Sequence, residues 1–373
     1  MLRSFSDPPV LSSFLRTTVA ANPLLLAFAL LFAPGFAAAE PQQTSNCPDL
    51  ATEVENIVKQ PALYNLRVEN DMFNGTDSQY TSGVSLSWVS ANLQNYFNDP
   101  CLPHWARQFN KMFDSAQPSP GTSRNMVITA GQLMYTPADR KRTDLIRNDR
   151  PYAAWLYLGM GYNARNGPRM DSVEINLGMV GPAALGRQAQ NLIHDTRGIP
   201  RFNGWSNQIR NEPGIQVVSE RKKRWEYTQE RNGVDAIVHY GASLGNVKTH
   251  VNSGLTLRAG RIPDDFGTSP IRPGGDCNAP TEGNFSRHFT HGGLHAFASL
   301  DARLVARDIF LDGNTFVDGP RVEKRRFVGD FASGIAWQWA GGKLAFARYV
   351  RSKEFSAQLN SHAYSSLTLS LEF

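Results

Sequence analysis

Apolar and polar side chains alternate along much of this chain, and this period of two residues constrains the fold more than any other feature. In the last seven residues, 367–373, three leucines and a phenylalanine alternate with threonine, serine and glutamate. Successive side chains of a β-strand point to opposite faces, so the pattern predicts a strand with one apolar face and one polar face. Similar alternation recurs at 84–88, 173–179, 236–244 and 335–339. The chain is therefore predicted to be all-β.

Two kinds of all-β protein have strands of this type. A transmembrane barrel places the apolar face on lipid and the polar face on its lumen, whereas a soluble sandwich has one wet face. No apolar run after residue 40 is long enough for a membrane-spanning helix, so a helical membrane protein is excluded. Aromatic residues near the predicted strand ends favour the barrel, whose membrane interfaces carry aromatic girdles. These residues are Trp155, Tyr157, Tyr162 and Tyr349.

The first 39 residues have the three parts of a secretory signal peptide. Arg3 and Arg16 make the start basic, an apolar run covers 23–36, and three alanines at 37–39 provide a cleavage site. A membrane anchor is the alternative, but the run is short and a Pro-Gly pair interrupts it. We expect export and cleavage after residue 39.

The charge balance excludes some partners. Cleavage lowers Lys plus Arg from 38 to 36 and Asp plus Glu from 33 to 32, so the mature chain carries a net charge of +4. No basic block is present, and nucleic acid is therefore not an expected partner. Scattered basic residues remain suited to a phosphorylated anionic surface.

Three cysteines, Cys47, Cys101 and Cys277, enter an oxidising compartment, where one disulfide is compatible with the sequence and one thiol is left over. The predicted strand order places all three on the periplasmic side. Cys47 with Cys101 is the preferred pair, and pairing with Cys277 stays open.

About twelve strands are predicted, with a periplasmic N-terminal segment at 40–62 and the barrel at 63–373. With both termini in the periplasm, odd strands run outward and the loops that follow them face the exterior. The predicted strands are 63–73, 79–91, 124–136, 152–164, 170–180, 213–228, 234–246, 250–261, 289–305, 322–339, 342–352 and 363–373.

One external segment, 182–198, is predicted to be a helix because it begins with proline and ends with glycine. Gln190 and His194 are four residues apart and would share one helix face. Histidine is the side chain best suited to take a proton at neutral pH, and Gln190 could hold a substrate or water beside it. A surface helix with two polar side chains is the alternative.

A second polar group lies at the outer ends of the first two predicted strands. Glu69, Asn70 and Asp71 end the first strand, and Thr81 begins the second. Adjacent strands of a hairpin bring such side chains together, and their oxygens are ligands that a hard cation such as calcium accepts. A hairpin turn favours the same residue types for conformational reasons alone.

Other external residues are weaker candidates. Glu212, where an external loop rejoins the barrel, could be a metal ligand or an ordinary rim carboxylate. Arg150 could bind an anionic headgroup or pair with Asp149 to close a loop. His295 belongs to a histidine cluster with His288 and His291, which the strand order places on the periplasmic side, and a metal role for it is not favoured. There is no H-E-x-x-H or Walker motif.

In order along the chain, the motifs of this sequence resemble those of the outer-membrane lipid A 3′-O-deacylase family (LpxR-like). The matching pieces are 69–71, 80–83, 131–137, 149–153, 180–182, Gln190, His194, 204–205, 211–213, 310–314 and the terminal Phe373.

The resemblance implies an antiparallel transmembrane β-barrel of twelve strands, with the active site between the outer barrel wall and a short external helix. It also implies calcium-dependent hydrolysis of the 3′-linked acyloxyacyl ester of lipid A in the outer membrane. His194 would activate water, and Gln190, Asn70 and Thr81 would be further catalytic positions.

The same resemblance suggests a metal set of Asp71, Asn70 and Glu212, in which Glu212 substitutes for an acidic residue that relatives carry near the catalytic histidine. Phosphates of lipopolysaccharide would meet Arg150, Lys141 and Arg142. A monomer is expected. A passive porin or structural barrel, and an outer-membrane phospholipase with a serine nucleophile, are the alternative functions.

Overall fold

The computed structural model describes most of the chain from residue 62 onward. The described residues are 62–71, 78–93, 96, 99, 102, 104–112, 123–229, 232–267 and 292–372. They form two units, the barrel body and residues 187–201, and each unit is described by itself. The predicted signal peptide, the three cysteines, His288, His291 and Phe373 lie outside the described residues, and the predictions made for them stay predictions.

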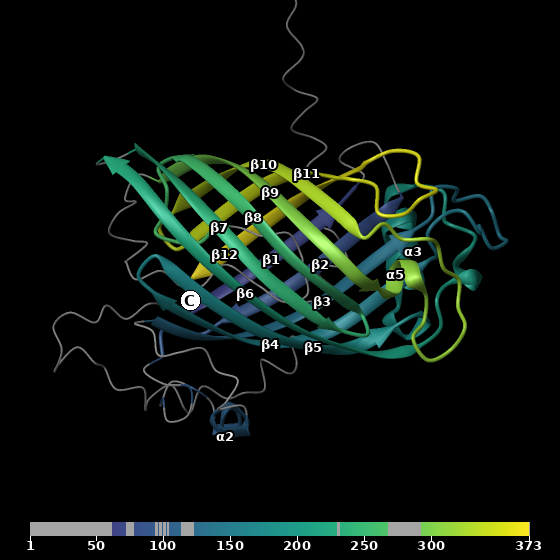
Figure 1. The fold of residues 1–373 in the computed structure, drawn as a ribbon, viewed down its shortest axis with the longest axis horizontal. Coiled ribbons are helices and arrows are strands. Elements are labelled where there is room, and N and C mark those ends of the chain that lie inside the picture. Colours follow the sequence, from purple (N-terminus) through teal and green to yellow (C-terminus); the bar gives the residue numbers. More distant parts are fainter. Residues whose placement is uncertain are drawn as a thin grey trace, which may run out of the picture. The chain divides into compact units, whose positions relative to one another are not determined.

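Twelve antiparallel strands form a closed barrel in which each strand pairs with its neighbours in sequence and β1 pairs with β12 (Figure 1). This confirms the predicted fold class. The strands are β1 Leu63–Asn70, β2 Gln79–Val89, β3 Ser123–Thr136, β4 Ala153–Asn166, β5 Arg169–Val180, β6 Glu212–Gln229, β7 Asn232–Gly245, β8 Lys248–Gly260, β9 Gly293–Asp308, β10 Phe327–Trp339, β11 Gly342–Arg351 and β12 His362–Glu372. The end at which odd-numbered strands finish is called the outer end, and the opposite end is called periplasmic.

Most predicted strand boundaries agree with the structure to within three residues, and β10 is the main exception. It begins at Phe327 instead of residue 322. The preceding residues are held in a loop, because the Val322 amide donates to the Leu311 carbonyl and the Arg325 amide donates to the Glu354 carbonyl. These amides are therefore not available to a neighbouring strand.

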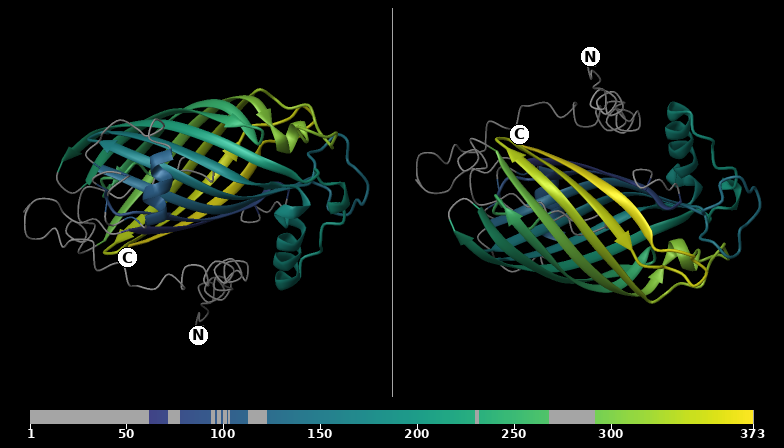
Figure 2. Two further views of the ribbon diagram at one scale, coloured as in Figure 1. Left: turned by 90° about the horizontal axis from the view of Figure 1, so that it is seen from below. Right: turned by 90° about the horizontal axis from the view of Figure 1, so that it is seen from above.

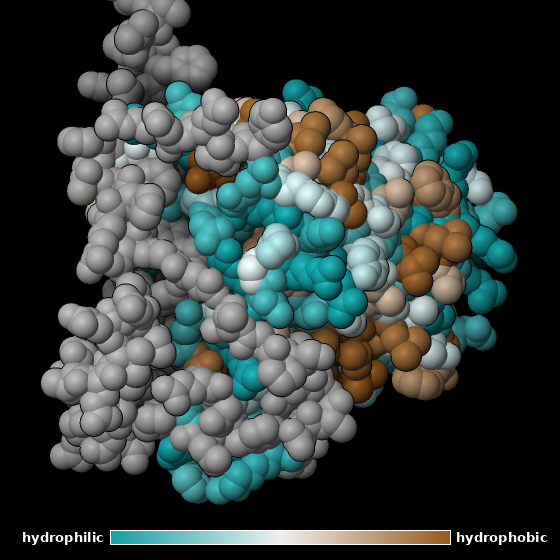
Figure 3. Space-filling view, turned by 60° about the vertical axis from the view of Figure 1, so that its left-hand side comes forward, coloured by the Kyte–Doolittle hydropathy of each residue, from teal (hydrophilic) through white to brown (hydrophobic). Residues whose placement is uncertain are grey.

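The wall of the barrel has the two faces that the alternation predicts. Most outward positions are apolar, and many of these side chains remain exposed, as in Leu177, Leu244 and Leu300. Strands run obliquely to the barrel axis in the two views of Figure 2. Hydrophobic surface lies in patches on the flank of the barrel in Figure 3. An apolar outer face of this kind fits a lipid environment.

The lumen is filled with ion pairs, and one group of them lies near the outer end. Arg351 donates to Asp330 at 2.8 and 3.1 Å and to the Tyr364 hydroxyl at 3.1 Å. Glu354 lies 3.4 Å from Arg150 and 3.5 Å from Arg351. Burial alone would raise the pKa of Glu354, but Arg150, Arg351 and Lys248 outweigh it and lower the pKa to about 2. These charges therefore stay paired inside the barrel.

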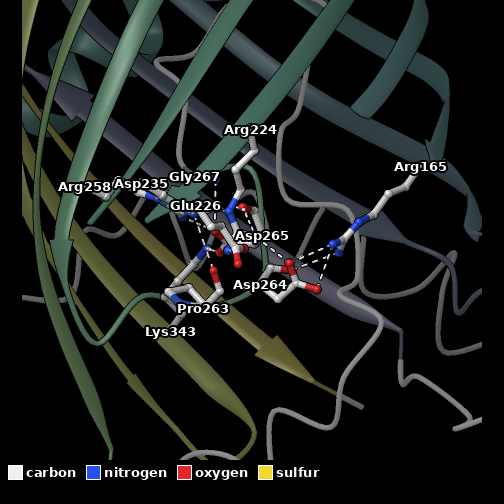
Figure 4. Close-up of polar contacts among 10 residues, drawn as sticks. All are labelled: Arg165, Arg224, Glu226, Asp235, Arg258, Pro263, Asp264, Asp265, Gly267 and Lys343. Carbon is white, nitrogen blue, oxygen red and sulfur yellow. Dashed lines mark hydrogen bonds and ion pairs between the residues drawn. The ribbon is translucent and has the colours of Figure 1, made fainter. Parts of the chain in front are cut away.

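A second group of ion pairs forms around residues 263–267, which follow β8 at the periplasmic end (Figure 4). Asp265 accepts a hydrogen bond from Lys343 at 2.8 Å and is also bound by Arg258, while Asp264 accepts two at 2.7 Å from Arg165. The three cations come from β11, β8 and β4, on different sides of the barrel. Residues 263–267 therefore cross the lumen, and we call this segment the periplasmic plug.

The described helices are short. They are α2 His104–Met112, α3 Gly186–Arg197 and α5 Ile309–Asp312, with single 3₁₀ turns η5 Pro182–Ala184 and η6 Trp205–Asn207. Within the part of the chain that the structure describes, none of the helices has the length and apolarity needed to span a membrane.

Candidate functional site

Several polar side chains occupy outward positions of the barrel wall close to its outer end. Leu367 is 42% exposed on the outer face of β12, and Ser365, two positions before it, must face the same way. Ser365 pairs with Asn70 of β1, and Asn70 pairs with Ser82 of β2, so all three point outward.

Thr136 of β3 belongs to the same group. Its strand neighbour Met134 pairs with Ser82, so Met134 faces outward and Thr136, two positions later, does too. We call Asn70, Ser82, Thr136 and Ser365 the wall patch. All except Asn70 are buried, although they lie on the face that elsewhere carries exposed leucines. Polar groups at this place are unusual for a lipid-facing wall and indicate a site.

Thr81 lies beside the wall patch in an irregular part of β2. The register between β2 and β3 shifts between Tyr80 and Ser82, which makes Thr81 a bulge, and its hydroxyl lies 2.6 Å from that of Thr136. Gln79, at the start of the strand, has a φ of 71°, a strained value for a side-chain-bearing residue. Bulges and strained residues concentrate at functional sites.

Asp71 closes the β1–β2 hairpin. It is fully buried, and its Oδ2 accepts a hydrogen bond of 2.5 Å from the Ser78 amide. This hydrogen bond gives Asp71 a conformational role in the turn, which is one of the two roles that the sequence allowed for this residue. It does not compete with ligation, because a carboxylate has lone pairs on both oxygens.

The predicted helix at 182–198 is divided in the structure. Residues 182–184 form the turn η5, Leu185 adopts a left-handed φ of 58°, and α3 begins at Gly186. Gly198 ends α3 with a φ of 65°, and the Ile199 amide donates to the His194 carbonyl at 2.8 Å. The glycine end was predicted correctly, and the single continuous helix was not.

Gln190 and His194 share one face of α3 and are both about 1% exposed. The Nδ1 atom of His194 lies 2.8 Å from the Pro200 carbonyl oxygen, which can only accept. Nδ1 therefore carries the proton, and Nε2 is the basic nitrogen of the neutral ring. This tautomer is the one that a general base at Nε2 requires.

Asp195 is an acidic residue next to His194, but it is an exposed partner of Arg201. The Arg201 guanidinium donates to the Asp195 carboxylate at 2.7 Å, and this hydrogen bond holds the pKa of Asp195 below its usual range. Pro200, through its carbonyl, is the residue that orients His194.

Arg150 was predicted to bind substrate, and the structure corrects this. Its side chain is inside the barrel, 1% exposed, where it pairs with Glu354 and lies 4.7 Å from the Tyr135 ring centroid. A residue so buried cannot meet a headgroup outside the barrel. Lys141 and Arg142 do lie exposed in the external loop after β3, where Arg142 pairs with Asp144.

Glu212 was predicted to join Asp71 and Asn70 around a metal ion, and the structure does not bring them together. Glu212 begins β6, which four strands separate from β1. Its carboxylate instead accepts hydrogen bonds from Asn246 at 2.8 Å, from Asn314 at 3.2 Å and from the Thr315 amide at 2.7 Å. Glu212 is a rim carboxylate that fastens two outer loops.

The chemistry of the remaining residues suits a calcium ion. Asn70 and Asp71 supply amide and carboxylate oxygens at the end of β1. The hydroxyls of Thr81, Ser82 and Ser365 lie on β2 and β12, the two strands that pair with β1. Hard cations accept such all-oxygen sets. Within the described residues, no group of three or more His, Cys, Asp or Glu side chains could hold a metal. A cation there would depend on amide and hydroxyl oxygens beside the single carboxylate.

The sequence contained a signal for the wall patch that was not used. Asn70 continues the outward series of Tyr64, Leu66 and Val68, and Ser365 interrupts the series from Ala363 to Leu371. A polar residue in phase with lipid-facing residues can thus be found from alternation alone. Its burial could not, because burial depends on what covers the wall.

The family model described as outer membrane protein LpxR matches residues 24–373. This match covers almost the whole sequence. The chain belongs to the LpxR family of outer-membrane proteins. Its placement in the outer membrane and its twelve-stranded barrel follow from this membership together with the observed fold.

One solved structure of the family has the same fold as this chain. LpxR from Salmonella typhimurium is 16% identical, with a TM-score of 0.67, covering 83% of this chain and 100% of that chain. The β domain of the Bordetella autotransporter BrkA is 8% identical, with a TM-score of 0.38 over 84% of this chain and 99% of that one. The translocator domain of NalP from Neisseria meningitidis is 8% identical, with a TM-score of 0.32 over 92% and 99%. No curated protein matches the chain significantly in sequence.

Proposed function

We propose that this outer-membrane protein is a lipid A 3′-O-deacylase, which hydrolyses the 3′-linked acyloxyacyl ester of lipid A in the outer leaflet. The observation that carries the proposal is the wall patch. Its polar side chains face outward near the outer end, where a membrane lipid and not a lumenal solute would meet them. Family membership supports the same substrate.

His194 is the proposed base. Its Nε2 accepts a proton from water, the water oxygen bonds to the ester carbonyl carbon, and the bond from that carbon to the alkoxy oxygen then breaks. The protonated imidazole returns the proton to the departing alkoxide, so no covalent enzyme intermediate is needed. The Pro200 carbonyl fixes the tautomer that this transfer requires, and Gln190 on the same face would orient the water.

Calcium is the proposed cofactor, with Asn70 and Asp71 as its protein ligands and Thr81 beside them. A bound calcium ion would polarise the ester carbonyl and offset the charge that develops on its oxygen. The closed hairpin, with the Ser78 amide bound to Asp71, holds this carboxylate in place before substrate arrives.

A passive pore is the alternative that the lumen argues against. The buried pair of Arg150 and Glu354 lies near the outer end, and the periplasmic plug crosses the opposite end. Side chains at both levels occupy the path that a solute would take. We therefore expect no appreciable single-channel conductance from the purified protein in a planar bilayer.

Mass spectrometry of lipid A tests the enzyme directly. Wild-type protein should release the 3′-linked acyl chain, and His194→Ala should reduce the rate by about 10²–10⁴-fold, the usual contribution of a general base. His104→Ala is a matched control, because His104 also lies four residues from a glutamine, Gln108, on a helix, but is exposed. Equal release by wild type and His194→Ala would refute the assignment of His194.

The phospholipase alternative is decided in the same assay. Supplying glycerophospholipid in place of lipid A should give no fatty acid, and a serine-directed inhibitor should leave lipid A deacylation unchanged. Inhibition by that reagent would favour a serine nucleophile. If calcium is the cofactor, a chelator should abolish deacylation, and added calcium should restore it. Full activity in the presence of the chelator would refute the proposed calcium cofactor.

A further inference from the structure

The lipid-facing wall carries very few charged side chains. Among outward strand positions of the described residues, most charges lie toward the periplasmic end; these are Arg124, Arg169, Asp171, Arg221 and Lys223. Only Arg307 and Arg348 occupy outward positions in the outer half of the described strands. Charge on this face is most costly at the bilayer midplane and least costly near the interfaces.

Arg307 is fastened to the protein, and Arg348 is not. Arg307 donates to the carbonyls of Asn246 and Gly313 and to the Thr315 hydroxyl, at 2.8 to 3.1 Å. Arg348 is exposed, and within the described part of the chain no hydrogen bond or ion pair engages it. It lies between Phe346 and Val350, which are 43% and 38% exposed, so it points away from the lumen.

The register places Arg348 beside the wall patch. It pairs directly with Ser365 of β12, and Ser365 pairs with Asn70 of β1. Arg348 is therefore two inter-strand spacings from Asn70, or about 10 Å along the wall. A flexible arginine side chain shortens that distance further.

Arginine is well suited to one kind of ligand at such a place. Its planar guanidinium binds phosphate oxygens through paired charge-assisted hydrogen bonds and is weakly hydrated, so it functions at a membrane interface. Because Arg348 lies about 10 Å from Asn70, it is within reach of the sugar headgroup of a lipid whose ester is bound at the wall patch.

We propose that Arg348 binds a phosphate group on the glucosamine headgroup of the lipid substrate and so selects phosphorylated lipid. This inference rests on the proposed deacylase function and replaces the buried Arg150 as the headgroup contact. Arg348 does not touch the ester, and its contribution is to substrate affinity.

The test compares lipid A that carries both phosphates with the same lipid enzymatically dephosphorylated, using full-length protein in detergent. For Arg348→Gln we expect KM on the phosphorylated lipid to rise about ten-fold, with kcat within two-fold and no change on the dephosphorylated lipid. Arg348→Lys keeps the charge but not the paired hydrogen bonds, so it should restore only part of the affinity. Arg169→Gln, which removes an outward charge at the other end of the wall, should change nothing.

Two kinetic results would overturn the proposal. One is an unchanged KM for Arg348→Gln on phosphorylated lipid A. The other is an equal rise in KM on both lipids, which would mean that the substitution perturbs the wall and not a phosphate contact.

A binding measurement separates this proposal from the proposed function. Native mass spectrometry of wild type and Arg348→Gln in nanodiscs should show that only wild type prefers phosphorylated lipid A, even if no acyl chain is ever released. If wild type kept this preference but released no acyl chain, the proposed deacylase function would be refuted, while the proposed lipid-binding role of Arg348 would stand. If inorganic phosphate bound wild type as tightly as the lipid does, the ligand would be a free anion and the lipid assignment would be wrong.

Discussion

The wall patch and the periplasmic plug are both polar clusters in one barrel, and they are built in opposite ways. In the plug, charged side chains point inward from strands on different sides and neutralise one another around Asp264 and Asp265. In the wall patch, neutral amide and hydroxyl groups point outward on adjacent strands at the opposite end.

The difference supports a stabilising role for the plug and agrees with the proposed binding role of the wall patch. Burial would raise the pKa of Asp265, but Lys343 and Arg258 hold it well below its usual range, so the plug is complete without any ligand. The wall patch places polar groups where an apolar residue would suit the lipid better. A barrel retains such groups when they bind something.

The largest expected effect concerns the plug. Asp265→Asn leaves Lys343 and Arg258 without one buried carboxylate, and it should lower the free energy of unfolding by about 3–5 kcal/mol. Urea-induced unfolding in detergent micelles measures this change. Asp264→Asn is the matched control, because Asp264 is 47% exposed and its ion pairs are screened by solvent, so its effect should be much smaller.

The same variants measure the division of roles between the two clusters. Specific deacylase activity of the Asp265→Asn protein that remains folded should match wild type. A large loss of activity at equal folded fraction would mean that the plug also shapes the site, and the distinction between the clusters would fail.

The next effect concerns the wall patch. Ser82→Leu combined with Ser365→Leu restores the apolar pattern of β2 and β12 and removes the polar groups, so the deacylase activity of the folded protein should fall about 100-fold, or about 2.7 kcal/mol. Mass spectrometry of lipid A gives the rate, and the heat-dependent gel shift of the barrel gives the folded fraction. Ser219→Leu, at an exposed outward position of β6, is the control and should keep full activity.

The barrel was predictable from sequence because one physical rule determines it. Every strand that crosses the membrane must alternate apolar and polar side chains. The strands predicted at 213–228 and 342–352 therefore differ from β6 and β11 by no more than one residue at either end. The start of β10 was missed because hydrogen bonds from distant loops, such as Arg325 to Glu354, prevent pairing there. Local alternation contains no information about such contacts.

The site was predictable only in part. Spacing placed Gln190 and His194 on one helix face, and the structure agrees. The inward orientation of Arg150 and its partner Glu354 depend on packing between segments that are about two hundred residues apart, which no local pattern reports. Juxtaposition of His194 with the wall patch remains a prediction.

The smallest expected effect is that of Glu212→Gln, and it distinguishes Glu212 from Asp71. The sequence predicted both carboxylates as metal ligands. Both Glu212 oxygens face donors only, from Asn246, Asn314 and the Thr315 amide, so an amide nitrogen at one of them would lose a hydrogen bond. Glu212→Gln should therefore cost about 1 kcal/mol of stability, seen as a small shift in the urea midpoint, and leave calcium-dependent activity unchanged. Asp71→Asn should show the reverse, with activity lost and recovered only at much higher calcium. If Glu212→Gln also raised the calcium requirement, the rim would have to approach the β1–β2 hairpin during catalysis, and Glu212 would regain its place as a ligand.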